Sequence, residues 1–128
     1  MDAFPDVESL LVHLLSPLAT TVSVTPPDLQ DRMPIIRVRR IGGADDGITD
    51  TSRVDVDVHA SSRTEAHTLA EQVRQFLLDG PHTAHGGVID RIVTEVAPHS
   101  LTHPDPGTRV VTATYRATTR RSSRKSLA

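Results

Sequence analysis

The sequence predicts an α+β fold, with two helices packed on one face of a mostly antiparallel sheet of four to five strands. Valine alternates with ionisable side chains along residues 53–60, the pattern of a half-buried strand. Apolar side chains then recur at helical spacing up to Leu78, and further strand-like segments flank this unit. We expect the order helix, strand, strand, strand, helix, strand, strand in one domain over residues 1–119.

The first helix is predicted over residues 5–18, where leucines recur on one face. Asp6 and Glu8 suit the positive end of its dipole, and Pro17 limits its length. A short strand is predicted over residues 21–25. Two prolines follow it, and because proline cannot donate a ladder hydrogen bond, they suit a sheet edge or a loop.

The second strand is predicted over residues 34–41, and a glycine-rich, acidic segment over residues 42–50 follows it. This composition is typical of a flexible loop, which would join the second strand to residues 53–60 as a long hairpin. At about ten residues the loop exceeds the usual two to five. It is either a plain surface hairpin or an assembly loop that becomes ordered on contact with a partner.

The second helix has clear start and stop signals. Ser62 and Glu65 form a capping box, and residues 79–81 read Asp-Gly-Pro, which ends a helix. Its apolar face is expected to cover the sheet and consists of Ala66, Leu69, Ala70, Val73, Phe76 and Leu77.

The C-terminal third is predicted to supply two more strands. Residues 82–87 are expected to form a loop, residues 88–97 a strand, and residues 98–107, with three prolines, an irregular connection. Residues 108–118 are dense in β-branched side chains and should form the last strand. The basic tail, residues 120–128, lacks periodicity, and we expect it to be disordered by itself.

Composition narrows the function classes. The chain has 128 residues, only 2% aromatic side chains and no cysteine, which excludes a disulfide framework and thiolate chemistry. The formal charge is −2, but four of the 14 Lys and Arg residues lie in the last nine positions, so residues 1–119 carry ten positive against 16 negative side chains, a net charge of −6. An acidic body argues against a phosphate-gripping surface. We expect a soluble, intracellular protein without membrane contact.

Candidate chemical sites are few. Asp55, Asp57 and His59 lie at alternate positions of one strand and could share a divalent cation, although a solvated strand face explains the same pattern. His82 and His85 offer two zinc ligands without a third. The glycine-rich segment lacks the Gly-Lys-Ser/Thr ending of a phosphate loop. We therefore expect no enzyme, no catalytic residue and no metal or other cofactor.

The order of several segments resembles one protein family. Residues 34–43 (PIIRVRRIGG), 54–60 (VDVDVHA), 66–78, 86–88, 104–106 and 109–115 together are similar to tail terminator proteins of long-tailed actinobacteriophages, over about residues 34–120. The resemblance implies a hexameric ring that caps the tail tube, stops its polymerisation and provides the docking surface for the head connector. It implies no catalytic residues. An acidic body suits a lumen through which DNA passes without specific binding.

We expect contacts with other subunits or with the tail tube protein in the acidic loop and the final strand. The final strand is suited to edge pairing with a neighbour, and the basic tail to an adjacent neck or tube component. The expected contact residues are Gly42, Gly43, Asp45, Asp46, Gly47, Asp50, Thr112, Thr114, Arg116, Arg120 and Arg121. The alternatives are another neck or head-completion protein, a small metal-dependent nuclease using Asp55, Asp57 and His59, and a ligand-binding regulatory module.

Overall fold

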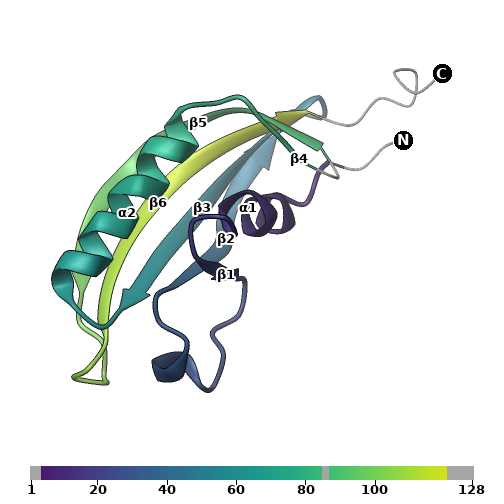
Figure 1. Ribbon diagram of the computed structural model, residues 1–128. Helices are drawn as coiled ribbons and strands as arrows, with labels where there is room; N and C mark the ends of the chain where they lie inside the picture. Colours follow the sequence, from purple (N-terminus) through teal and green to yellow (C-terminus); the bar gives the residue numbers. More distant parts are fainter. Residues whose placement is uncertain (1–3, 85–86, 121–128) are drawn as a thin grey trace.

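The computed structural model describes residues 4–84 and 87–120, and in it a curved sheet of six strands carries two helices (Figure 1). The strand order is β1-β2-β3-β6-β5-β4. All neighbouring strands are antiparallel except β1 and β2, which are parallel. Along the chain the elements are α1 (Val7–Leu15), β1 (Thr20–Val22), the 3₁₀ turn η1 (Leu29–Asp31), β2 (Ile35–Asp45), β3 (Thr49–Ala60), α2 (Arg63–Leu78), β4 (His82–Ala84), β5 (Gly87–Leu101) and β6 (Arg109–Arg120).

The α+β class with two helices is confirmed, but the predicted strand count and order are wrong. Strand β4 lies within the segment expected to be a loop, and it pairs with the start of β5. A strand of three residues is too short to show an alternating pattern, so only its partner defines it. The sheet was predicted to be mostly antiparallel, and it is mixed, because β1 and β2 are parallel while the other four strand pairs are antiparallel.

The expected long loop at residues 42–50 is also wrong, because β2 and β3 continue through most of it. The pairing of β2 with β3 extends as far as Asp45, which lies opposite Asp50. Only residues 46–48 remain as the turn between the two strands. The pairing shifts by one residue between Arg40 and Gly42, a β-bulge. At Gly43, φ is +135° and an added Cβ would lie 2.2 Å from the Thr51 carbonyl oxygen, so glycine is required there by close backbone approach.

The last two strands are longer than predicted. Strand β5 passes through Pro98, which lies at a register shift where proline interrupts no regular pairing. Strand β6 is paired with β3 on one side and with β5 on the other. The expectation that this final strand forms a free edge is therefore wrong. Its β-branched composition reflects a central position in the sheet instead.

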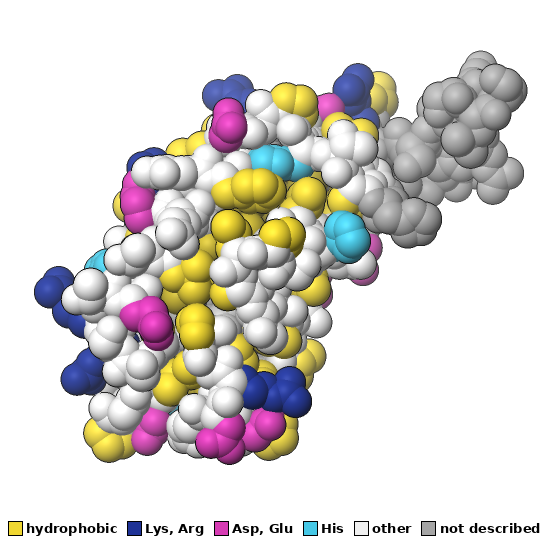
Figure 2. Space-filling view, in the orientation of Figure 1, with side chains coloured by type: hydrophobic (Ala, Val, Ile, Leu, Met, Phe, Trp, Pro, Cys, Tyr) yellow, Lys and Arg dark blue, Asp and Glu magenta, His cyan; other side chains and the backbone are white. Residues whose placement is uncertain are grey.

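The core lies between the sheet and the helices and is aliphatic. Ser62 caps α2 as predicted, since its hydroxyl accepts from the Glu65 backbone N–H at 3.1 Å. Of the predicted stripe on α2, Phe76 is half-buried and the rest is buried. From α1, Leu10, Leu11 and Leu15 join the same core. Figure 2 shows hydrophobic side chains gathered between the two helices.

No helix in the described part of the chain is both long and apolar enough to cross a membrane.

Candidate assembly site on the hairpin and the polar sheet face

Two neighbouring features contain most of the predicted contact residues. The first is the hairpin tip, residues 45–48, at the end of β2 and the start of β3. The second is the polar face, the side of the sheet away from the helices, where side chains of β3, β5 and β6 meet. Both arise because alternate strand residues point to opposite sides of a sheet.

Side-chain hydrogen bonds hold the hairpin tip in shape. One carboxylate oxygen of Asp46 accepts from the backbone N–H groups of Ile48 (2.9 Å) and Thr49 (2.7 Å), and Asp45 accepts from Gly47 at 3.0 Å. Hydrogen bonds from Thr49 and Ile48 lower the pKa of Asp46 below its ordinary value. Gly47 has φ +86°, which glycine adopts without strain. The tip is therefore an ordered, negatively charged turn.

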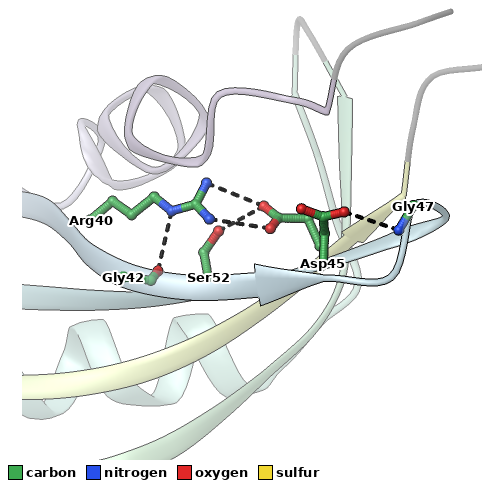
Figure 3. Close-up of polar contacts among 6 residues, drawn as sticks. Arg40, Gly42, Asp45, Gly47 and Ser52 are labelled. Atoms are coloured by element: carbon green, nitrogen blue, oxygen red, sulfur yellow. Dashed lines mark hydrogen bonds and ion pairs between the residues drawn. The ribbon is translucent and has the colours of Figure 1, made fainter.

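An ion pair closes the base of the hairpin (Figure 3). The Arg40 guanidinium donates to both carboxylate oxygens of Asp50, at 3.2 and 3.3 Å, and also to the Gly42 carbonyl at 3.2 Å. The Ser52 hydroxyl donates to Asp50 at 3.0 Å, and Asp50 is only 2% exposed. The backbone N–H of Arg40 donates to the Glu8 carboxylate at 2.7 Å, which links α1 to this strand.

On the polar face, β3 and β6 are joined by two matched side-chain pairs. The Thr112 hydroxyl donates to Asp57 at 2.5 Å, and the Thr114 hydroxyl donates to Asp55 at 2.7 Å. Each pair joins residues directly opposite one another in the antiparallel register. The Arg39 guanidinium approaches Asp55 at 3.5 Å from β2. These carboxylates are therefore occupied by neighbouring strands.

Glu95 of β5 joins two arginines that face each other across β3 and β6. Arg53 donates to one of its carboxylate oxygens at 2.8 and 2.5 Å, and Arg116 donates to the other at 2.7 Å. The hydrogen bonds from Arg53, and then those from Arg116, lower the pKa of the Glu95 carboxyl. One carboxylate thus offsets the repulsion between two guanidinium groups.

Arg120, predicted to begin the basic tail, is instead the last residue of β6. Its guanidinium donates to both oxygens of Asp90 on β5, at 2.8 and 3.0 Å. The strand continues to this residue because its backbone still pairs with Thr49 of β3. Arg121 and the rest of the tail lie outside the described residues.

His59 is buried at the end of β3 and its ring meets that of His103 edge-on, with centroids 5.9 Å apart. Its Nδ1 has no hydrogen-bond partner among the described residues. Burial lowers the pKa of His59. The charge of Asp57 acts in the opposite direction, and the neighbouring His103 and Arg37 lower the pKa further.

The structure also places the residues considered as metal ligands. Asp55, Asp57 and His59 do lie on one face, but cross-strand pairing accounts for both carboxylates. His82 is a buried residue of β4 whose Nε2 donates to the Leu77 carbonyl at 2.9 Å, near the end of α2. His85 lies outside the described residues. Within residues 4–84 and 87–120, no group of three or more His, Cys, Asp or Glu side chains could hold a metal ion.

Sequence reasoning missed the Arg40–Asp50 pair and the role of Glu95. A signal for the first pair was present. Arg40 continues the series of Ile36 and Val38, which point toward the helices, and a charged side chain in such a series needs a partner. No comparable signal exists for Glu95, because its partners come from two distant strands.

Comparisons with known proteins identify a matching family and a solved structure with a similar fold. Residues 3–126 match the family model described as phage tail termination protein. A chain from a structure titled "Virion of native gene transfer agent (GTA) particle" has the same fold, with a TM-score of 0.57 and 12% sequence identity over 88% of this chain and 85% of that chain. No curated protein matches the sequence.

Proposed function

The chain belongs to the phage tail termination protein family and is a structural, non-enzymatic virion protein, and we propose that it caps the tail tube as a homo-oligomeric ring. The ring stops polymerisation of the tail tube protein and forms the surface on which the head–tail connector protein docks. The family match over residues 3–126 is the observation that carries the proposal. The sequence resemblance adds the finer expectations of six copies, of kinship with long-tailed actinobacteriophages and of assembly in the host cytoplasm.

The hairpin and the polar face supply the contacts with neighbouring subunits or with the tube in this proposal. Their polar groups are already fixed by bonds within the chain, which supports such a role because fixed groups lose little conformational freedom on binding. The residues proposed for these contacts are Gly42, Gly43, Asp45, Asp46, Gly47, Thr112, Thr114, Arg116, Arg120 and Arg121. Asp50 is proposed with them, and because it is 2% exposed it would act by holding the base of the hairpin.

The negative net charge of residues 1–119 is compatible with a ring through which DNA passes. Residues 1–119 carry a net charge of −6, and like charge lowers the time that DNA spends against a wall. DNA would then pass through the lumen without specific binding.

Tube-capping assays test the proposal. Tail tube protein is polymerised with and without this protein, and tube ends and tube lengths are measured by negative-stain electron microscopy. We expect ring-shaped caps and shorter, uniform tubes with the protein, and open-ended growth without it. A protein that stays monomeric at high concentration and neither binds nor shortens tubes would contradict the proposed function.

A further inference from the structure

A groove lies at the end of the sheet opposite the hairpin tip, and we call it the end groove. The start of α2, the end of β5, the start of β6 and the connection between these two strands surround it, and its volume is about 470 Å³. Figure 1 shows this connection and the β2–β3 hairpin at opposite ends of the molecule. The residues that line the end groove include Arg63, Leu101, His103, Thr108, Arg109 and Val110.

The end groove is basic and partly apolar. Arg63 and Arg109 are exposed on it, Leu101 is 51% exposed, and no acidic side chain of the described residues lines it. Within residues 4–84 and 87–120, neither Arg63 nor Arg109 pairs with an acid. Among the described residues, Arg37 and Arg91 also form no ion pair, whereas seven other arginines do, namely Arg32, Arg39, Arg40, Arg53, Arg74, Arg116 and Arg120. The two groove arginines therefore remain available for carboxylates from another molecule.

The hairpin tip has the complementary chemistry. Asp45 and Asp46 bond to backbone N–H groups of their own turn and to no cation in the described part of the chain. Ile48, the last residue of the hairpin tip before β3, is 71% exposed. The turn is fixed by Asp46 and its base by the Arg40–Asp50 pair, so docking would cost little ordering entropy.

We propose that the hairpin tip of one copy docks in the end groove of a second copy of this chain. Ile48 packs against Leu101 and Val110, and the tip carboxylates lie beside Arg63 and Arg109. Because tip and groove occupy opposite ends of each molecule, the contact is head-to-tail, and such contacts close into a ring when the rotation between copies permits. The inference rests on the proposed function in that it names the contact that would build the ring.

Reciprocal charge reversal tests this contact. Asp45→Lys places a positive tip against Arg109, and Arg109→Glu places Asp45 against a negative groove, so each variant alone should associate at least about ten-fold more weakly than the unmodified chain. An equal mixture of the two should recover association, because the lysine introduced in one chain meets the glutamate introduced in the other and the remaining contact is unmodified. Sedimentation velocity, with and without tail tubes, measures the assembly.

Matched substitutions control for charge alone. Asp79→Lys and Arg91→Glu make the same changes at exposed positions outside the tip and the groove, and we expect association within about two-fold of the unmodified chain. Ile48→Ser, which removes the apolar contact without changing charge, should weaken association about ten-fold or more. Far-UV circular dichroism should not change in any of these variants, since every altered side chain is exposed. Urea midpoints should fall only slightly, and most in Asp45→Lys, which also removes the bond from the Gly47 backbone N–H.

The outcomes separate this inference from the proposed function. If the tip and groove variants assemble as the unmodified chain does, or if mixing fails to restore association, the docking contact is wrong while ring formation and tube capping can still hold. Variants that self-associate normally but no longer cap tubes would show that the tip binds the tube, which also overturns the contact. An unmodified chain that forms no assembly, alone or on tubes, overturns both proposals.

Discussion

The two faces of strands β3 and β6 are stabilised in different ways, although they share one backbone ladder. Toward the helices, Val54, Val56 and Val58 lie opposite Tyr115, Ala113 and Val111, and all six side chains are buried. On the polar face the same strands present Asp55 and Asp57 opposite Thr114 and Thr112. The inner residues stabilise the fold by packing against many neighbours in the core. The outer residues stabilise it through separate hydrogen bonds, each between two side chains.

This difference determines which face can be changed without unfolding the protein. Filling a core is collective, since each lost methyl group leaves a cavity that the neighbours cannot close. The contacts on the polar face are separate pairs, each of which contributes about 1.5 kcal/mol or less, and the exposed ion pairs among them are weakened by salt. The polar face can therefore carry contact residues for assembly at small cost to stability.

The largest expected effect contrasts two residues on opposite faces of β2. Ile36 is 0% exposed, and Ile36→Ala should lower the free energy of unfolding by about 2–5 kcal/mol, the range for truncating a buried aliphatic side chain. Arg39→Ala should lower it by at most about 1 kcal/mol, because its pair with Asp55 is long and exposed. Urea unfolding of both variants checks the contrast, and equal losses would refute it.

The second prediction concerns the Arg40–Asp50 ion pair, which lies on the side of β2 and β3 that faces the helices. Asp50→Ala removes the carboxylate that Arg40 and Ser52 bind, and we expect a loss of about 1.5–3 kcal/mol in unfolding free energy. The loss stays below that of a fully buried pair because the Arg40 side chain is 40% exposed and can reach water. Ser52→Ala, which removes only one of these bonds, is the control and should cost less.

These contrasts also explain how much of the fold was predictable. Local patterns identified β3, β6 and α2, since valine alternation, β-branched density and the Ser62 cap each act within a few residues. The hairpin and β5 were predicted too short because Gly42, Gly43 and Pro98 are loop signals when read alone. Pairing with a neighbouring strand, across a bulge in each case, overrides that local preference.

The candidate site was predictable only in part, for a related reason. The sequence places Asp55 and Asp57 on one face of a strand. It does not show that Thr114 and Thr112 bind them, because register between strands 55 to 59 residues apart depends on the whole sheet. The end groove is still harder to predict from the sequence, because α2, β5 and β6 all contribute residues to it.

The third prediction uses pH to separate the faces, because His59 is a buried, titratable residue on the otherwise polar side. Its pKa lies below the ordinary value of 6.5, so the folded state favours the neutral ring. The neutral His59 ring contributes its full share to the free energy of unfolding above about pH 6.5. This contribution is lost as pH falls toward the lowered pKa, because the unfolded chain takes up the proton at a higher pH than the folded chain does. Asp57 reduces the shift by favouring the charged form.

Urea midpoints between about pH 7.5 and about pH 5.5 measure this effect. His59→Gln removes the titrating group and should flatten the decline. A decline of the same slope in both proteins would assign the pH dependence to groups other than His59.

The smallest expected effect concerns a buried polar group on the inner face, the hydroxyl of Tyr115. Burial raises the pKa of Tyr115 to about 12, and its hydroxyl oxygen has no hydrogen-bond partner among the described residues. Tyr115→Phe keeps the ring and removes a polar atom whose burial is unfavourable, so unfolding free energy should stay equal or rise by up to about 1 kcal/mol. Thr114→Val is the matched change on the polar face, where the lost hydroxyl does have a partner, and it should cost about 0.5–1.5 kcal/mol. If Tyr115→Phe were the more damaging of the two, the inner face would depend on a polar contact, and the division between collective packing inside and paired contacts outside would not hold.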